Sequence, residues 1–221
     1  MTTPRRPKNA PHEGIDARSL AFAEDFVPLS EAVKAAREQA VVLNAPTLSP
    51  GAVAMLTVLT RAIHATAVVE VGTGTGESGL AFFEGMGVEG VLTSIDSQAQ
   101  WQIETRKAFL SESIPTRRFR LIPGNPLDIL DNLREGAYDI VFLNGNKLEL
   151  VEYLAQALRL LRSGGLVILN NALWQNKVAD PSNEDDETVI IREALQSVAE
   201  TEEFTSALLP LGEGLLVAVR S

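Results

Sequence analysis

From residue 66 onward, short apolar segments alternate with helical ones, and this alternation constrains the fold more than any other feature. The apolar segments, which we predict to be strands, span 67–71, 91–95, 119–122, 138–143 and 166–169. Strands that alternate with helices imply a parallel sheet. The clearest predicted helix covers 148–163 and should stop at Gly164–Gly165. After a last helix at 187–199, two apolar segments flank Gly212–Gly214 and predict an antiparallel hairpin. We therefore predict an α/β fold with a doubly wound sheet and an antiparallel C-terminal hairpin.

The first 65 residues follow a different pattern and divide into two parts. Residues 1–15 are predicted to form a disordered tail, and residues 16–65 to form N-terminal helices. Within the helical part, Val53 and Leu56 belong to an apolar face that recurs at three- and four-residue spacing. We expect residues 66–221 to form the core that carries the function.

Composition excludes several classes of function. A net charge of −10 argues against nucleic-acid binding, which needs a concentrated basic surface. No segment approaches the roughly 18 apolar residues of a membrane span, and the N-terminus lacks the apolar region of a signal peptide. The chain has no cysteine, and its two histidines, His12 and His64, lie far apart, so a thiolate or histidine metal site is not expected. We expect a cytoplasmic protein that binds no membrane.

A ligand of such a sheet binds outside the carboxyl ends of its strands. The polar residues at these strand ends are 72–79, Asp96, Gly124–Asn125, 144–147 and 170–174. Asn170 and Asn171 directly follow a buried strand, although neither amide can ionise. Asn125 is placed to bond an adenine edge, but a Pro-Gly-Asn-Pro turn explains it nearly as well.

The glycine-rich segment VVEVGTGTGESG can be interpreted in two ways. Residues 74–79 match the G-x-G-x-x-G fingerprint of dinucleotide binding, and Asp96 follows about 20 residues later, as a ribose-binding acid should. If the motif starts at Gly72 instead, Glu70 in the strand precedes three alternating glycines. A carboxylate at Glu70 sits poorly beside a pyrophosphate. It suits a ligand with an amino group, or it fixes the loop by accepting N–H bonds.

We favour S-adenosylmethionine as the ligand of this loop, because that molecule carries an ammonium, a sulfonium, a carboxylate and a ribose diol. Glu70, Ser78 and Asp96 could each serve one of these groups, together with the free N–H groups of the following helix. The alternatives are a nicotinamide or flavin nucleotide and a turn without a ligand, and Asp96 could be only a helix cap. The candidate cofactor-binding residues are Glu70, Gly72, Thr73, Gly74, Gly76, Ser78, Asp96, Gly124, Asn125 and Asn144.

Five motifs in order make the chain resemble the cation-dependent O-methyltransferases, a family typified by catechol and caffeoyl-coenzyme A O-methyltransferases, and especially its bacterial branch. EVGTGTGESGL is similar to the family's EVGT-x-x-GYS loop, TSID to its ribose-binding strand end, and PGNPLDIL to its adenine-lining segment. YDIVFLNGNK resembles YD-x-x-F-x-DADK, and GGLVILNNALW resembles GGL-x-x-x-DNVLW. The resemblance implies the Rossmann-like, seven-stranded fold of class I S-adenosylmethionine-dependent methyltransferases.

The resemblance also locates a metal site that this sequence has altered. In the family, the first Asp of DADK and the Asp–Asn pair of DNVLW bind a magnesium-like ion that holds the substrate's hydroxyls. Their counterparts here are Asn144, Asn170 and Asn171, and Asn146 replaces the second Asp of DADK. Magnesium is usually held through one or two carboxylates, and an amide carries no formal charge. We therefore expect no tight divalent metal at these positions, which would instead form a hydrogen-bonding floor.

Lys147 matches the lysine that the family places near the acceptor oxygen, where a desolvated amine accepts a proton or stabilises an oxyanion. The resemblance thus implies Lys147, Asn144 and Asn170 as catalytic candidates, with Trp174 over the acceptor. A solvated surface lysine is the alternative for Lys147. We predict an S-adenosylmethionine-dependent O-methyltransferase that acts on a hydroxyl of a small molecule without a metal. The alternative is a degenerate regulatory or scaffold protein that only binds the cofactor. By resemblance, the N-terminal helices cap the pocket and support a homodimer.

Overall fold

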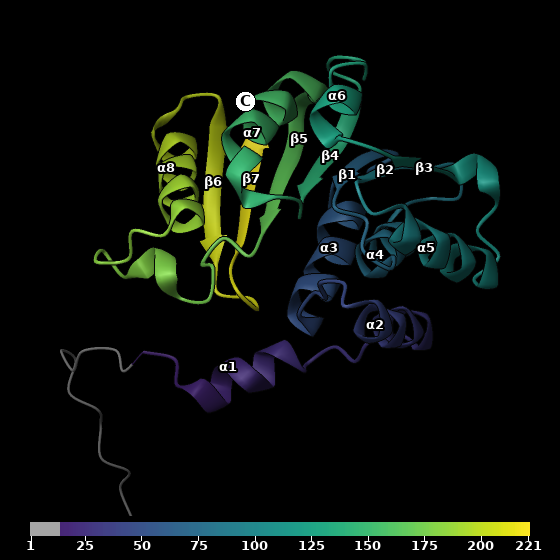
Figure 1. Ribbon diagram of the computed structural model, residues 1–221, viewed down its shortest axis with the longest axis horizontal. Helices are drawn as coiled ribbons and strands as arrows, with labels where there is room; N and C mark the ends of the chain where they lie inside the picture. Colours follow the sequence, from purple (N-terminus) through teal and green to yellow (C-terminus); the bar gives the residue numbers. More distant parts are fainter. Residues whose placement is uncertain (1–13) are drawn as a thin grey trace, which may run out of the picture.

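The computed structural model describes residues 14–221, and its centre is one seven-stranded sheet in the order β3-β2-β1-β4-β5-β7-β6 (Figure 1). The strands are β1 (Ala67–Val71), β2 (Val91–Asp96), β3 (Phe119–Pro123), β4 (Tyr138–Leu143), β5 (Leu161–Asn170), β6 (Phe204–Leu209) and β7 (Leu215–Arg220). Strands β1 to β5 pair in parallel, and β7 pairs antiparallel with β5 and β6. The predicted doubly wound sheet with its antiparallel hairpin is confirmed. Most of the predicted tail, 1–13, lies outside the described residues.

Eight α-helices are described, and they lie on both faces of the sheet. They are α1 (Ala17–Glu24), α2 (Glu31–Leu43), α3 (Pro50–Ala62), α4 (Glu77–Gly85), α5 (Ala99–Ser111), α6 (Pro126–Leu130), α7 (Leu150–Leu160) and α8 (Asp186–Glu200). None of these helices is long and apolar enough to cross a membrane.

Alternation along the strands builds an apolar core on each face of the sheet. All six residues of β4 are buried, as expected of a central parallel strand covered on both sides. Ile140 and Phe142 pack into the cluster that contains residues of α2 to α5, whereas Val141 and Leu143 pack against α7 and α8. The same alternation in β1 turns Glu70 away from the α7 face, on which Val69 and Val71 lie.

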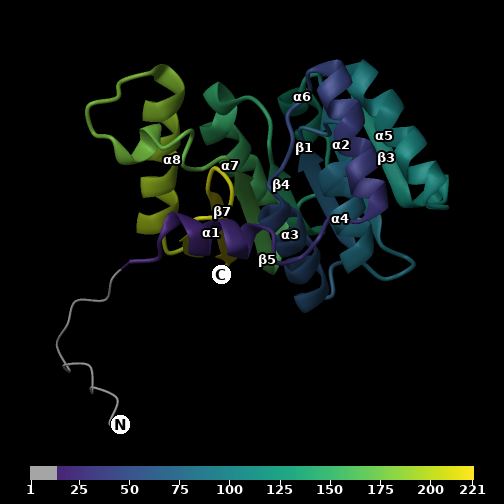
Figure 2. The ribbon, with the colours of Figure 1, turned by 90° about the horizontal axis from the view of Figure 1, so that it is seen from below.

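The N-terminal helices join the rest of the molecule through capping contacts. Seen from below, α1 lies across the turn between β6 and β7, next to α3 (Figure 2). The Glu24 carboxylate at the end of α1 accepts a bond from the Gly51 N–H at 2.9 Å and another from the Gly212 N–H. α3 packs against α4, so the helical segment is anchored beside the glycine loop.

One predicted boundary is wrong. The helix expected over 148–163 is shorter, because α7 ends at Leu160 and Leu161 is already extended, with a ψ of 143°. Gly164–Gly165, expected to stop the helix, lie inside β5. A Cβ at Gly165 would come within 3.1 Å of the Asp139 carbonyl oxygen, so this glycine permits close contact between β5 and β4.

Candidate functional site

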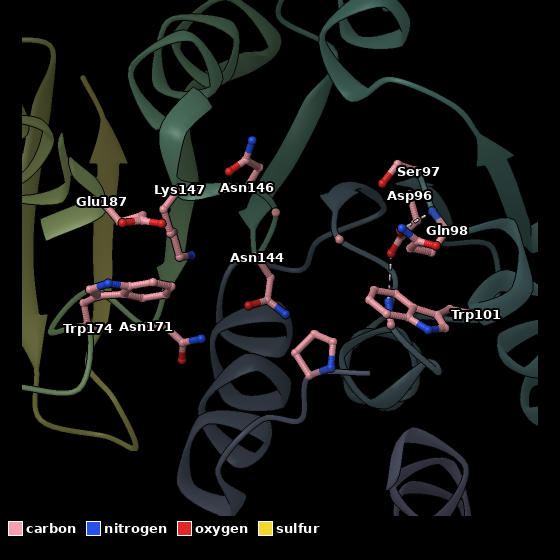
Figure 3. Close-up of a pocket in the computed structure, with 14 residues that line it drawn as sticks. Asp96, Ser97, Gln98, Trp101, Asn144, Asn146, Lys147, Asn171, Trp174 and Glu187 are labelled. Atoms are coloured by element: carbon pink, nitrogen blue, oxygen red, sulfur yellow. Dashed lines mark hydrogen bonds between the residues drawn. The ribbon is translucent and has the colours of Figure 1, made fainter. Parts of the chain in front are cut away.

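Two adjoining cavities lie at the carboxyl ends of the parallel strands, where a ligand of such a sheet is expected to bind. The larger, about 420 Å³, runs from Asp96 and Trp101 at one end, past Asn144, to Lys147 and Trp174 at the other (Figure 3). The second, about 350 Å³, shares the wall formed by Gly72, Asp96, Ser97, Gly145 and Asn146. We call the end near Asp96 the cofactor half and the end near Lys147 the acceptor half.

The glycine loop after β1 forms the floor between the two halves. Gly72 has a φ of +92°, and a Cβ there would lie 2.6 Å from the Asn144 carbonyl oxygen, so only glycine lets β1 and β4 approach in this way. Gly74 also has a positive φ, and its N–H donates to the Asp96 carboxylate at 3.2 Å. Gly72 and Gly74 both line the larger cavity. Gly76 precedes α4 with a φ of +103°.

Asp96 connects the glycine loop with the turn that follows β2. One carboxylate oxygen accepts from the Gly74 N–H, and the other accepts from the Gln98 N–H at 2.8 Å. Burial raises the pKa of Asp96, and these backbone bonds oppose the rise. The carboxylate is therefore held in place by the backbone, although it lines both cavities and is predicted to bind a ribose.

Glu70 and Ser78 lie beneath the loop rather than in either cavity. Glu70 is fully buried and accepts hydrogen bonds from the hydroxyls of Ser78 and Ser94. Thr73 shares a 2.7 Å hydroxyl contact with Ser94, which continues the network. Burial raises the pKa of Glu70 to about 7. Of the two predicted roles for Glu70, this placement fits the one in which it fixes the loop, but through hydroxyls rather than N–H groups.

The segment after β3 lies at the second cavity. Gly124 and Asn125 line it together with Tyr153 of α7. The Asn125 side-chain oxygen accepts from the Leu127 N–H at 2.9 Å and so caps α6. The contact between Asn125 and an adenine edge stays a prediction.

The asparagines of β4 and β5 meet, as expected for neighbouring strands. The Asn170 amide donates to the Asn144 side-chain oxygen at 3.0 Å. Asn144 and Asn171 line the larger cavity, whereas Asn170 is buried behind them. Asn146 also lines the cavity, and its side-chain oxygen caps the short helix that begins at Lys147.

Lys147 is almost completely buried at 5 % exposure, although it lines the cavity. Its ammonium donates to the Asn170 carbonyl oxygen at 2.8 Å. Burial lowers the pKa of Lys147 to about 8, and the nearby Glu213 carboxylate partly opposes that shift. Lys147 is thus not the solvated surface lysine of the alternative interpretation.

The donor set at this position does not fit a divalent metal. Asn144 and Asn170 bond to each other, so the Asn144 side-chain oxygen already accepts one hydrogen bond. The Lys147 ammonium adds a positive charge beside them. Among residues 14–221, no cluster of three histidine, aspartate or glutamate side chains could hold a metal ion. Neutral oxygens beside a cation offset too little of the hydration that magnesium would lose.

Comparisons with known proteins identify the family. Residues 21–221 match the family model described as O-methyltransferase. The chain belongs to this O-methyltransferase family. An O-methyltransferase relative from Mycobacterium sp. strain JLS is 40% identical over 201 residues, which cover 91% of each chain, and one from Mycobacterium avium is 38% identical over 91% of this chain and 90% of its own.

Solved structures show the same fold. A Corynebacterium glutamicum protein superimposes with a TM-score of 0.84 at 27% identity, covering 91% of this chain and 94% of its own. The O-methyltransferase TomG from Streptomyces achromogenes, crystallised with S-adenosylmethionine, has a TM-score of 0.83 at 23% identity, covering 93% and 96%.

Five residues that line the larger cavity of this O-methyltransferase were not among the candidates, and two of them, Ser97 and Gln98, directly follow Asp96. The other three come from elsewhere in the chain. Pro46 comes from the segment between α2 and α3, Trp101 from α5 and Glu187 from the first turn of α8. None of the three belongs to a strand end, where the polar candidates were sought. The alternation of strands and helices in the sequence does not indicate which helix residues reach the cavity.

The loop after β5 carries Trp174 into the acceptor half. Asn171 and 174–176 all have positive φ, with Trp174 at +44°, which is unfavourable for a bulky residue. This tight turn places the Trp174 indole beside Lys147 and Glu187 (Figure 3). Unfavourable backbone at a cavity wall is typical of functional sites.

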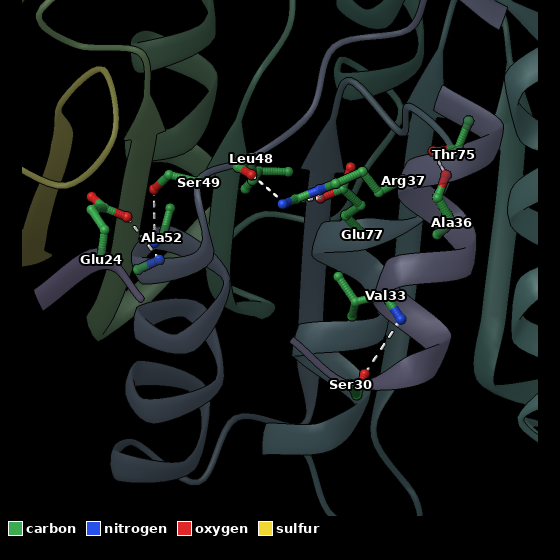
Figure 4. Close-up of polar contacts among 11 residues, drawn as sticks. Glu24, Ser30, Val33, Ala36, Arg37, Leu48, Ser49, Ala52, Thr75 and Glu77 are labelled. Atoms are coloured by element: carbon green, nitrogen blue, oxygen red, sulfur yellow. Dashed lines mark hydrogen bonds and ion pairs between the residues drawn. The ribbon is translucent and has the colours of Figure 1, made fainter. Parts of the chain in front are cut away.

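An ion pair ties α2 to the start of α4. Arg37 donates to the Glu77 carboxylate at 2.6 Å and to the Leu48 carbonyl oxygen (Figure 4). The Thr75 hydroxyl donates to the Ala36 carbonyl oxygen at 2.7 Å, which adds a second link. Glu77 stands where the family usually has tyrosine. Its burial raises its pKa against the opposing effect of Arg37.

Proposed function

We propose that this enzyme transfers the methyl group of S-adenosylmethionine to a hydroxyl of a small molecule without using a divalent metal. The observation that carries the proposal is the acceptor half, in which bonded amides stand at the positions that hold the metal in the family and a buried lysine lies beside them. The cofactor half supports the methyl donor, because a glycine loop and a buried aspartate border the same cavity.

The cofactor would bind with its ribose at Asp96 and its adenine in the second cavity, near Asn125. An aspartate held by two backbone bonds can accept from both ribose hydroxyls without moving. The methionine part would lie over Gly72 and Gly74 and point its methyl group toward Asn144 and Lys147.

In the transfer step, the acceptor oxygen attacks the methyl carbon in line with the carbon–sulfur bond, whose electron pair goes to sulfur and gives S-adenosylhomocysteine. The hydroxyl proton moves to the neutral amine of Lys147, which becomes an ammonium. Burial brings the pKa of Lys147 to about 8, so that the neutral amine is available near neutral pH. Asn144 and Asn171 would orient the acceptor by hydrogen bonds.

Methyl transfer to simple phenols and catechols, measured as S-adenosylhomocysteine formed, tests this function. We expect the same rate in a chelator and in millimolar magnesium. The N144D/N170D variant, which restores two carboxylates, should gain magnesium dependence and serves as the matched control. Cofactor binding without turnover of any hydroxyl compound would favour the scaffold alternative, which the joint loss of the acids supports.

We also propose that the enzyme is a homodimer whose contact includes α1. This helix has no buried residue, and Phe22 and Phe26 are more than two-thirds exposed, at 71% and 72%. Adjacent exposed aromatic side chains are typical of surfaces that bind a partner. Light scattering should give twice the chain mass for the native protein, and a monomer mass for F22S/F26S. A native monomer would contradict this proposal.

A further inference from the structure

The acceptor half carries more negative than positive charge. Glu187 lines the cavity, and Glu213, in the turn between β6 and β7, lies near enough to raise the pKa of Lys147. Lys147 is the only cation among the described residues that line the cavity. An acceptor entering this half therefore meets a field dominated by carboxylates.

Lys147 does little to neutralise Glu187. Its ammonium is turned toward the Asn170 carbonyl oxygen, to which it donates a hydrogen bond. The other nearby cation is Lys177, which is bound to Asp185 at 2.7 Å. Within the described part of the chain, the Glu187 carboxylate has no hydrogen-bond or ion-pair partner of its own. Its charge is left for a ligand.

An aromatic face lies next to this carboxylate. Trp174 is held in the acceptor half by a turn with positive φ angles, and its indole lies near Glu187 and Lys147 (Figure 3). An indole attracts a cation over its face, and a carboxylate pairs with the same charge. Together they have the chemistry that recognises an ammonium group.

We propose that the methyl acceptor is a hydroxyl compound that also carries an ammonium group, which Glu187 and Trp174 bind while the hydroxyl faces Lys147. The inference rests on the proposed function, since it assigns the substrate class of that same site. Glu187 is then a specificity-determining residue. An acceptor with a carboxylate in place of the amine would put like charges together and bind most weakly.

The two tryptophans of the chain allow a direct binding test, because both line the cavity, one in each half. In W101F, Trp174 is the only tryptophan and reports on the acceptor half. The S-adenosylhomocysteine complex of W101F is titrated with three matched catechols that carry an aminoethyl, an ethyl or a carboxyethyl group. Fluorescence gives a Kd for each. W174F, with Trp101 alone, reports cofactor binding in parallel.

We expect the aminoethyl catechol to bind about tenfold more tightly than the ethyl compound, as for a partly buried charge pair, and the carboxyethyl compound to bind most weakly. In W101F, the added substitution E187Q should reduce the preference for the aminoethyl over the ethyl catechol to less than about twofold, and E187K should reverse this preference. E193Q removes the same charge from α8 at a residue outside the cavity and should leave the preference intact.

Equal binding of the three catechols, or no binding of the amine to the cofactor complex, would overturn the inference. An amine preference that E187Q leaves unchanged would also overturn it. Failure of W174F to bind S-adenosylhomocysteine would instead contradict the proposed function. Amine binding that depends on Glu187 but gives no methylated product would support the inferred ligand class and contradict the proposed activity.

Discussion

The two halves of the cavity are built by different means. In the cofactor half, the backbone holds the charged group in place, since Asp96 accepts N–H bonds from both the glycine loop and the turn after β2. In the acceptor half, each bond starts from a side chain, since the Asn170 amide donates to the Asn144 side-chain oxygen and the Lys147 ammonium donates to the Asn170 backbone carbonyl oxygen. The first half depends on chain geometry and the second on the identity of a few residues.

Because of this difference, the two halves tolerate different substitutions without loss of the fold. Replacing aspartates by asparagines in the acceptor half alters charge but preserves shape, so the sheet and the cofactor loop tolerate it. A side chain added at Gly72 would meet the Asn144 carbonyl oxygen at 2.6 Å and disturb both halves. Substrate chemistry can therefore vary on a constant cofactor site.

The largest effect should come from the acceptor half. We expect K147M to lower kcat by about 10²–10⁴-fold, the usual cost of losing a general base, with little change in S-adenosylhomocysteine affinity. In the native enzyme, burial lowers the pKa of Lys147 to about 8, so the neutral amine and the rate should increase as pH rises through that value. Initial rates across pH 6 to about 10 would show this. K147R keeps the charge but cannot lose its proton, so an active K147R would contradict the assignment of Lys147 as a base.

Loss of the Arg37–Glu77 ion pair should have the next largest effect. R37A leaves a buried carboxylate without its partner, which destabilises folding by about 2–3 kcal/mol, allowing for the partial exposure of Arg37. Urea unfolding measures the change, and the double variant R37A/E77Q should regain most of it. Equal stability of R37A and the native enzyme would mean that α2 is held by its apolar contacts alone.

A substitution in the cofactor half should change cofactor affinity and leave kcat nearly unchanged, whereas K147M in the acceptor half should do the reverse. We expect D96N to weaken S-adenosylhomocysteine binding by about 10- to 30-fold, because the amide gives up charge-assisted bonds. Calorimetry gives the affinity, and kcat at saturating cofactor should change little. A D96N enzyme with native affinity would show that Asp96 only connects the loop and the turn.

The smallest effect should come from Glu70, beneath the loop. Burial raises its pKa from 4.5 to about 7, so the folded protein binds more protons than the unfolded chain between these pH values. The ionised Glu70 therefore destabilises the fold increasingly as pH rises from 4.5 to about 7. E70Q removes this cost, and its stability relative to the native enzyme should be about 1 kcal/mol greater at about pH 7 than at about pH 6. Thermal unfolding at the two pH values measures the difference. The same relative stability at both would place the titration of Glu70 elsewhere.

The sequence predicted the sheet well, because five buried strands and a hairpin leave a strong apolar pattern. It also brought together Asn144, Asn170 and Lys147, since the carboxyl ends of adjacent parallel strands must meet. It failed at the end of α7, where Leu161 suits a helix and a strand equally and its pairing with β4 decides.

Several of the residues that the sequence missed lie on helices and not at strand ends. Glu187 and Arg37 lie on polar helix faces that look like ordinary solvated surface. Only the packing of α8 against the short helix at Lys147 makes Glu187 a cavity wall, and only the packing of α2 against α4 makes Arg37 a partner of Glu77. The position of Glu70 under the loop was foreseen only in part, because strand alternation shows the face but not the hydroxyl partners.

Binding of 4-ethylcatechol to the S-adenosylhomocysteine complex, with chelator and then with magnesium, tests most directly whether the acceptor half works without a metal. Calorimetry on chelator-treated protein gives the affinity in each condition. We predict the same affinity in both, because Lys147 and the asparagines contact the acceptor themselves. Binding that appears only with magnesium would show that three amides suffice to hold the ion, and would contradict this account.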